Sequence, residues 1–139
     1  MSDPNDKPRI LIVEDHPLIA ELVETRLRIE GMQPVKCPGG REALSLVGIE
    51  HFDLVILDIM MPDVDGYEVL RHIRATTSTA TLPVIFLTAK STPADIEKGL
   101  SLGANHYITK PFSGQDLMRK VRLCLDELRA SRAESPAAG

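Results

Sequence analysis

Short runs of consecutive apolar residues recur along the chain and predict β-strands. Three of them, Ile10 to Val13, Leu54 to Leu57 and Val84 to Leu87, are unbroken and rich in Val, Ile and Leu. Runs of this kind are typical of central strands that are covered on both faces. Two shorter and more mixed runs, Pro34 to Cys37 and Asn105 to Ile108, are expected to be edge strands.

Between these runs, apolar residues recur at the three- and four-residue spacing of amphipathic helices. The residues expected on buried helix faces are Ile19, Leu22, Val23 and Leu27 after Pro17; Ala43, Leu44 and Val47 after Gly39 and Gly40; Val69, Leu70 and Ile73; Ile96 and Leu100; and Leu117, Val121, Cys124 or Leu125, and Leu128.

Capping residues and glycines mark where some of these helices should begin and end. Thr92 with Asp95, and Ser113 with Asp116, have the spacing of capping pairs. The helix-ending residues are expected to be Gly31, Gly48 and Gly103.

The alternation of strands and helices predicts an α/β fold of five βα units. Such a chain forms a parallel sheet with helices on both faces and right-handed crossovers. The three wholly apolar strands should be central, and the order 2-1-3-4-5 meets that condition. This order is taken from flavodoxin and the chemotaxis protein CheY, because the pattern alone does not determine it.

Length and composition are consistent with one domain. The chain has 139 residues, 43% of them hydrophobic, which is enough for a sizeable core. We expect the domain to span residues 9–129, after a disordered N-terminus at residues 1–8. The small and polar residues 130–139 predict a flexible tail or the start of a linker.

Charge, cysteines and hydropathy narrow the possible partners and the compartment. The formal net charge is -4, and no cluster of Lys and Arg suits a phosphate backbone, which argues against direct nucleic-acid binding.

Cys37 and Cys124 lack the spacing of a zinc or redox motif and are interpreted as buried thiols. No apolar stretch approaches the ~20 residues that span a bilayer. Met1 to Pro8 does not resemble a signal peptide, so we expect a cytoplasmic location.

Polar residues follow the predicted strands at the points where they end. Glu14 and Asp15 follow the first run, Asp58 follows Leu57, Thr88 follows Leu87, and Lys110 lies two residues after Ile108. The carboxyl ends of parallel strands meet at one edge of a sheet, so these groups should lie together. Crowded carboxylates raise one another's pKa values unless a cation neutralises them. The pattern therefore predicts a divalent ion beside one reactive aspartate.

Four motifs at these strand ends resemble those of the receiver domain of two-component response regulators. They are Val13-Glu14-Asp15; Leu57 to Pro62 followed by Asp65-Gly66; Leu87-Thr88-Ala89; and Tyr107 to Phe112. The resemblance covers about Arg9 to Leu128 and implies a flavodoxin-like, CheY-like fold. It also implies Mg²⁺-dependent phosphotransfer from the phosphohistidine of a histidine kinase, or of a histidine phosphotransfer protein, to an aspartate.

The resemblance assigns roles to individual residues. Asp58 would be the phosphoacceptor. The ligands of Mg²⁺, or of Mn²⁺, would be Glu14, Asp15, Asp58 and the backbone carbonyl of Met60. Lys110 would pair with Asp58 and then with the phosphoryl group, and its bond to Pro111 would be cis.

Thr88 and Tyr107 would form the switch. Thr88 would donate a hydrogen bond to the new phosphoryl group, and Tyr107 would then move inward. A face made by the fourth helix, the fifth strand and the fifth helix would bind the downstream target. Met60 and Lys90 occupy positions that modulate access of water in the family. We interpret Tyr67 and His106 as surface or packing residues.

Other functions are weaker but remain open. A metal-dependent phosphohydrolase with an aspartyl nucleophile, like the haloacid dehalogenases, would carry a second Asp where this chain has Met60. A pseudo-receiver would lack an acidic or lysine position, and none is lost here. A flavin module is disfavoured because the chain has no Trp and only 4% aromatic residues. We therefore expect a signalling protein that catalyses its own phosphorylation and dephosphorylation rather than a turnover enzyme.

Overall fold

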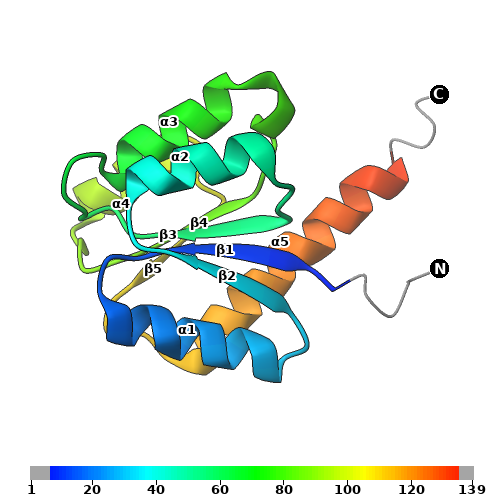
Figure 1. Ribbon diagram of the computed structural model, residues 1–139, viewed down its shortest axis with the longest axis horizontal. Coiled ribbons are helices and arrows are strands. Elements are labelled where there is room, and N and C mark those ends of the chain that lie inside the picture. Colours follow the sequence, from blue (N-terminus) through cyan, green and yellow to red (C-terminus); the bar gives the residue numbers. More distant parts are fainter. Residues whose placement is uncertain (1–6, 135–139) are drawn as a thin grey trace.

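Strands and helices alternate along residues 7–134, which are the residues that this computed structural model describes (Figure 1). The strands are β1 (Arg9–Val13), β2 (Gln33–Cys37), β3 (Leu54–Leu57), β4 (Val84–Thr88) and β5 (His106–Thr109). The helices are α1 (Pro17–Ile29), α2 (Gly40–Ile49), α3 (Gly66–Ala75), α4 (Pro93–Ser101) and α5 (Gly114–Glu134), with a short 3-10 helix η1 (Thr77–Thr79).

The strands form one parallel sheet in the order β2-β1-β3-β4-β5. The predicted order is therefore confirmed, with the three wholly apolar strands in the centre. Each strand boundary differs from its prediction by at most one residue.

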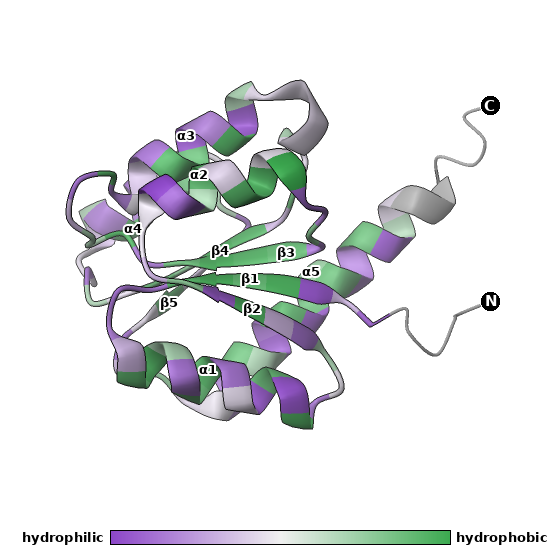
Figure 2. Cartoon of the chain, in the orientation of Figure 1, coloured by the Kyte–Doolittle hydropathy of each residue, from purple (hydrophilic) through white to green (hydrophobic). Residues whose placement is uncertain are grey.

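Helices cover both faces of the sheet, with α1 and α5 on one face and α2, α3 and α4 on the other (Figure 1). Alternate residues of a strand point to opposite faces. Ile10, Ile12 and Ile56 accordingly pack with α1 and α5, whereas Leu11 and Val55 pack toward α2 and α3. Both faces of the central strands are therefore apolar, as the green strands of Figure 2 show.

The capping predictions are confirmed. Of the three glycines predicted to end helices, the prediction for one is wrong. Thr92 and Asp95 form a reciprocal capping box, and the Ser113 hydroxyl accepts from the Asp116 N–H. Gly31 and Gly103 have positive φ angles beyond their helices. Gly48 instead lies within α2, which continues to Ile49.

Two leucines expected on buried helix faces are exposed. On α1 the buried residues are Ala20, Val23 and Leu27, whereas Leu22 is 63% exposed. Leu22 is about 100° around the helix from Val23, so docking on the inner residues turns it outward. On α4 Leu100 is also exposed, and the buried residue is Gly99.

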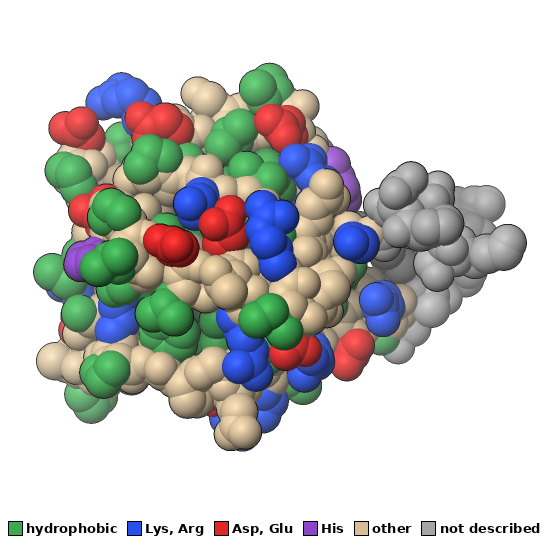
Figure 3. All heavy atoms as spheres, turned by 60° about the horizontal axis from the view of Figure 1, so that its bottom comes forward, with side chains coloured by type: hydrophobic (Ala, Val, Ile, Leu, Met, Phe, Trp, Pro, Cys, Tyr) green, Lys and Arg blue, Asp and Glu red, His purple; other side chains and the backbone are tan. Residues whose placement is uncertain are grey.

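The exposed residue Leu22 belongs to an apolar stripe on α1 that includes Leu18 and Ile29. Hydrophobic side chains are interspersed with charged ones on the face that Figure 3 shows, seen from the side on which α1 lies. Among the described residues, no helix is long and apolar enough to cross a membrane.

Helix α5 extends beyond the sheet on the side of the strand amino ends (Figure 1). It continues to Glu134, so the domain boundary predicted at residue 129 falls inside this helix, and the flexible tail or linker predicted for residues 130–139 stays a prediction. Ala, Arg and Glu favour helix, and no proline occurs there before Pro136. Residues 1–6 and 135–139 lie outside the described residues, so the predicted disordered N-terminus and linker stay predictions.

Candidate functional site

Main-chain hydrogen bonds place the polar residues at the carboxyl edge of the sheet. The Glu14 N–H donates to the Cys37 carbonyl at 3.0 Å, and the Asp58 N–H donates to the Val13 carbonyl at 3.0 Å. The Lys110 N–H donates to the Thr88 carbonyl at 2.8 Å. These bonds extend the ladders just past the strands, so the positions of the side chains follow from the register of the sheet.

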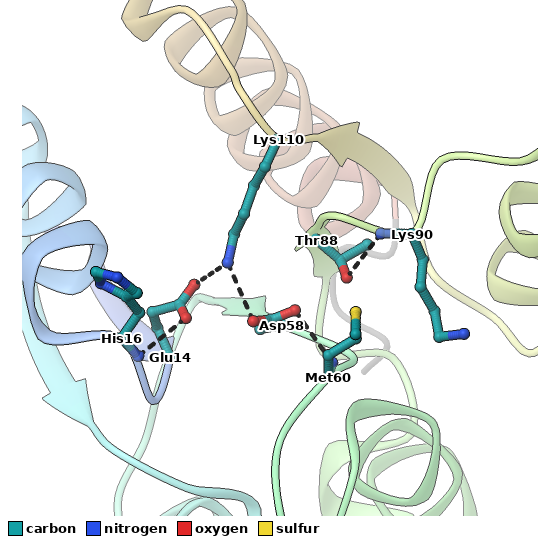
Figure 4. Close-up of polar contacts among 7 residues, drawn as sticks. All are labelled: Glu14, His16, Asp58, Met60, Thr88, Lys90 and Lys110. Atoms are coloured by element: carbon teal, nitrogen blue, oxygen red, sulfur yellow. Dashed lines mark hydrogen bonds and ion pairs between the residues drawn. The ribbon is translucent and has the colours of Figure 1, made fainter.

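The ammonium of Lys110 joins two of the predicted carboxylates (Figure 4). Its Nζ lies 2.7 Å from Glu14 Oε1 and 3.1 Å from Asp58 Oδ2. The other Asp58 oxygen, Oδ1, accepts from the Met60 N–H at 3.1 Å. The carboxylate of Asp58 is only 5% exposed, and hydrogen bonds on both of its oxygens orient it. The predicted contact of Lys110 with Asp58 is present, whereas its contact with Glu14 had not been expected.

Burial and charge shift the pKa values of two of these groups in the same direction. Burial raises the pKa of Glu14 above its usual value, and the charge of Asp58 adds to this effect, while the Lys110 ammonium opposes it. Burial alone would lower the pKa of Lys110, but its hydrogen bonds to Glu14 and Asp58, together with the charges of these two carboxylates, outweigh burial and raise the pKa. Lys110 is therefore a cation at neutral pH.

The carboxylates of Glu14, Asp15 and Asp58 form a candidate metal centre. Their oxygen atoms lie within 4.8 Å of one another, and Asp15 is exposed while the other two are buried. Mg²⁺ prefers oxygen ligands and usually keeps several waters, so this donor set suits it. Met60 contributes its N–H to Asp58, and the role of its carbonyl stays a prediction.

Thr88 is fully buried at the end of β4, and its hydroxyl accepts from the Lys90 N–H at 3.4 Å. In the view of Figure 4, the Asp58 carboxylate lies between Glu14 and Thr88, in agreement with the sheet order. The Lys90 side chain is directed away from Asp58, and its ammonium lies 3.9 Å from Asp95. In this structure Thr88 therefore lies beside the Asp58 carboxylate, whereas the Lys90 ammonium points away from it (Figure 4).

Tyr107 already lies inward, which differs from the expectation that it moves inward only after phosphorylation. The residue is 9% exposed, and its hydroxyl donates to the Lys90 carbonyl at 2.7 Å. Its ring meets Phe86 edge to face, with centroids 5.9 Å apart. Gly99 of α4 leaves space for this ring, because a Cβ there would lie 2.9 Å from Tyr107 Cε2.

Gly66 positions the backbone of Asp58, and the sequence did not reveal why a glycine is needed there. A Cβ at this position would lie 2.4 Å from the Asp58 carbonyl oxygen and 2.7 Å from the Ile59 Cα. A residue with a side chain would therefore displace the backbone that carries Asp58. The Asp65-Gly66 pair is visible in the sequence as part of a motif, but this close approach is not.

The bond between Lys110 and Pro111 is cis, as the resemblance implied. Tyr67 is buried and packs against Phe86 with ring centroids 5.8 Å apart. It is thus a packing residue, one of the two alternatives proposed for it. His106 is partly buried and lies 3.4 Å from Glu127.

Comparisons with known proteins agree with this geometry. A family model described as the response regulator receiver domain matches residues 10–122. The probable transcriptional regulator ycf27 of Galdieria sulphuraria is 44% identical over 119 residues, which cover 86% of this chain and 46% of that protein. The transcriptional regulatory protein TrcR of Mycobacterium tuberculosis is 40% identical over 129 residues, covering 93% of this chain and 49% of that protein. The chain thus spans about half the length of these two relatives.

A solved structure adds information on metal binding in a similar protein. It is the receiver domain of a sensor histidine kinase from Pseudomonas aeruginosa, with a magnesium ion coordinated in the active site cleft. The two chains are 32% identical with a TM-score of 0.80, and the match covers 86% of this chain and 98% of the other.

Proposed function

This chain belongs to the response regulator receiver domain family of two-component systems, and on this premise we propose that Asp58 accepts a phosphoryl group from a phosphohistidine. The donor would be a histidine kinase or a histidine phosphotransfer protein. One observation carries the proposal: the buried Asp58 carboxylate is oriented by the Lys110 ammonium and the Met60 N–H, beside the carboxylates of Glu14 and Asp15.

The reaction exchanges one bond to phosphorus for another. An oxygen of Asp58 forms a bond to phosphorus while the bond from phosphorus to the donor imidazole breaks, and the electron pair of that bond returns to the imidazole nitrogen. Phosphoryl transfer depends mainly on alignment and charge stabilisation. Lys110 would transfer its contact from Asp58 to a phosphoryl oxygen, and the Thr88 hydroxyl would donate a hydrogen bond to another.

The three carboxylates and the Met60 carbonyl would hold Mg²⁺, or Mn²⁺ in its place. When bound, the ion would neutralise the carboxylates and the phosphoryl oxygens that approach them. The donor set supports this assignment because Glu14, Asp15 and Asp58 supply only oxygen ligands.

Phosphorylation would shift the populations of two conformations of the α4-β5-α5 face. Tyr107 supports this proposal, because its hydroxyl contacts the Lys90 carbonyl, two residues after Thr88, and its ring packs against Gly99 of α4. A downstream protein would respond only if it binds the two conformations with different affinity. We place this signalling in the cytoplasm, with no direct contact between this domain and nucleic acid or membrane.

The domain would act as a signalling module rather than as a turnover enzyme. Met60 supports this view, because a thioether cannot act as the second acid that an aspartyl phosphohydrolase uses. The relatives named transcriptional regulators are about twice as long as this chain. A longer protein with a DNA-binding output is therefore compatible with the proposal.

Phosphorylation by acetyl phosphate and Mg²⁺ tests the proposal directly. Intact mass spectrometry should detect one added phosphoryl group that is labile to base. Asp58→Asn should abolish it, whereas Asp63→Asn, an exposed aspartate of the following loop, should be labelled like the wild type.

Three outcomes would contradict the proposal. Equal labelling of Asp58→Asn and wild type would assign the phosphoryl group to another residue. Rapid release of many phosphates per protein molecule, without a detectable adduct, would favour the phosphohydrolase. A wild type that is folded but not labelled would favour the pseudo-receiver.

A further inference from the structure

A second group of potential metal ligands lies at the other end of β5 from the carboxylate site. His106 begins β5, and Cys124 and Glu127 belong to α5. Lys110 is four residues farther along the chain, which corresponds to roughly 13 Å of extended strand. The two groups of ligands are therefore separate.

The packing of α5 on the sheet brings these three side chains together. His106 shares a strand face with Ile108, because residues two apart in a strand point the same way. Ile108 packs among residues of α5 in the core. Cys124 and Glu127 are three residues apart and share a helix face. Their ligand atoms and that of His106 all lie within 4.8 Å of one another.

We propose that His106, Cys124 and Glu127 form a Zn²⁺ site, with a water molecule as the fourth ligand. Imidazole, thiolate and carboxylate are the protein ligands that Zn²⁺ binds, at metal distances of about 2.0 to 2.3 Å. Tetrahedral bonds of that length separate neighbouring ligand atoms by roughly 3.3 to 3.8 Å. His106 Nε2 and Glu127 Oε1 are already 3.4 Å apart.

The remaining adjustment is small and is shared by the side chains of Glu127 and His106. Separations of up to 4.8 Å must shorten by no more than about 1.5 Å to match the tetrahedral spacing. Rotation of the 65% exposed Glu127 side chain would adjust its distance to the Cys124 thiol, and rotation of the His106 ring would adjust the distance between its Nε2 atom and that thiol. The buried thiol of Cys124 would supply the fixed point of the site.

The two cysteines of the chain differ in a way that supports the site. Cys37 Sγ donates to the Gly39 carbonyl at 3.2 Å. Among the described residues, the thiol of Cys124 has no hydrogen-bond partner, although it is equally buried. On binding, the cation would replace the thiol proton of Cys124, which passes to solvent.

An occupied site would join β5 directly to α5. Both elements belong to the face that we propose for partner binding, so Zn²⁺ would restrict their relative movement. This consequence depends on the proposed function. Metal binding itself does not depend on it, and it can be tested without phosphorylation.

Cobalt titration of the tag-free protein tests the site, because a thiolate bound to Co²⁺ gives a charge-transfer band in the near ultraviolet. Saturating Mg²⁺ keeps the carboxylate site occupied. The wild type should bind one Co²⁺ with this band, and Zn²⁺ should abolish the band by displacement. Cys124→Ala should lose the band, whereas Cys37→Ala should keep it.

Two further ligand variants and one exposed control complete the test. Glu127→Gln and His106→Gln should bind Zn²⁺ at least tenfold more weakly than the wild type in competition with a chromophoric chelator. His51→Gln changes an exposed histidine elsewhere and should bind as the wild type does.

The absence of the thiolate band in wild type, or its presence in folded Cys124→Ala, would overturn the proposal. His106 and Glu127 would then be an ordinary surface pair, and Cys124 a core residue. If Cys124→Ala does not fold, Glu127→Gln decides, because Glu127 is exposed and its loss leaves the core intact. Unchanged Zn²⁺ affinity of that variant would exclude the site.

Discussion

Gly99 provides the space that keeps the Tyr107 ring inside the protein, so we expect Gly99→Ala to move that ring outward. A Cβ at Gly99 would lie 2.9 and 3.1 Å from two ring carbons of Tyr107 and 3.0 Å from Phe86 Cδ2. Carbon atoms make their best contacts at about 3.5 to 4.0 Å. Rotation of Tyr107 would remove two of these three contacts, whereas Phe86 is held in the core.

The free energies of the inward and outward arrangements are of similar size, so relief of the two short contacts decides the position of the ring. Overpacking a core costs about 1 to 3 kcal/mol if the Tyr107 ring stays inside. Outward rotation instead loses the hydrogen bond of Tyr107 to the Lys90 carbonyl, which contributes about 0.5 to 1.5 kcal/mol. It also loses the edge-to-face contact with Phe86, which contributes about 0.5 to 1.5 kcal/mol. The gain of about 0.5 to 1 kcal/mol that alanine brings to helix α4 is common to both arrangements and helps the variant to fold. We therefore expect the variant to fold with Tyr107 largely exposed.

The ionisation of Tyr107 reports its position. Burial, with smaller contributions from Tyr67 and Asp95, raises the pKa of Tyr107 from 10.0 to about 12. An exposed ring would titrate near 10, a change of two units or about 2.7 kcal/mol. At pH 10.5, roughly 3% of an inward Tyr107 and roughly 75% of an outward one would be ionised. Ultraviolet difference absorption measures this fraction.

The titration should be made in a Tyr67→Phe background. The chain has two tyrosines, so this background leaves Tyr107 as the only one. The Tyr67 hydroxyl is buried without a hydrogen-bond partner among the described residues, so its removal should cost little. Gly48→Ala is the matched control, because it lies within helix α2 and its Cβ would meet nothing within 4 Å. A Tyr107 pKa in Gly99→Ala that stays as high as in the Tyr67→Phe background alone would refute the reasoning, since α4 or Phe86 would then have moved instead.

Three further predictions concern stability and the metal. Arg74→Ala should lower the free energy of unfolding in urea by about 3 kcal/mol. Its guanidinium donates to partly buried loop carbonyls at 2.6 to 3.3 Å, and such charged bonds contribute about 1.5 to 3 kcal/mol each. The exposed Arg71→Ala should change the free energy of unfolding by less than about 0.5 kcal/mol. Burial raises the pKa of Cys124 from 9.0 to about 12, so its contribution to stability is complete below pH 9 and is lost as pH rises toward 12. In metal-free buffer, the free energy of unfolding of the wild type should thus fall by about 1.4 kcal/mol more than that of Cys124→Ala between pH 8 and 10. Equal decreases in the two proteins would contradict this prediction. Asp15→Asn should bind Mg²⁺ at least tenfold more weakly by calorimetry, and an unchanged affinity would remove Asp15 from the ligand set.

The sequence alone determined the order of the elements and the residues that gather at the carboxyl edge. Unbroken apolar runs such as Leu54 to Leu57 have few alternatives to a buried parallel strand. Once the strands are parallel, Glu14, Asp58 and Lys110 must follow their ends at one edge. This part of the site is local in sequence, because each polar residue follows its own strand closely.

The tertiary structure alone decided which side chains touch. Helical spacing placed Leu22 near Val23, but only docking on the sheet selected which of them is buried. The inward position of Tyr107 depends on Gly99, a residue of another element. The meeting of His106 with Cys124 likewise depends on how α5 lies against β5. Spacing along one element determines which residues share a face, whereas contacts between elements depend on how their surfaces pack together.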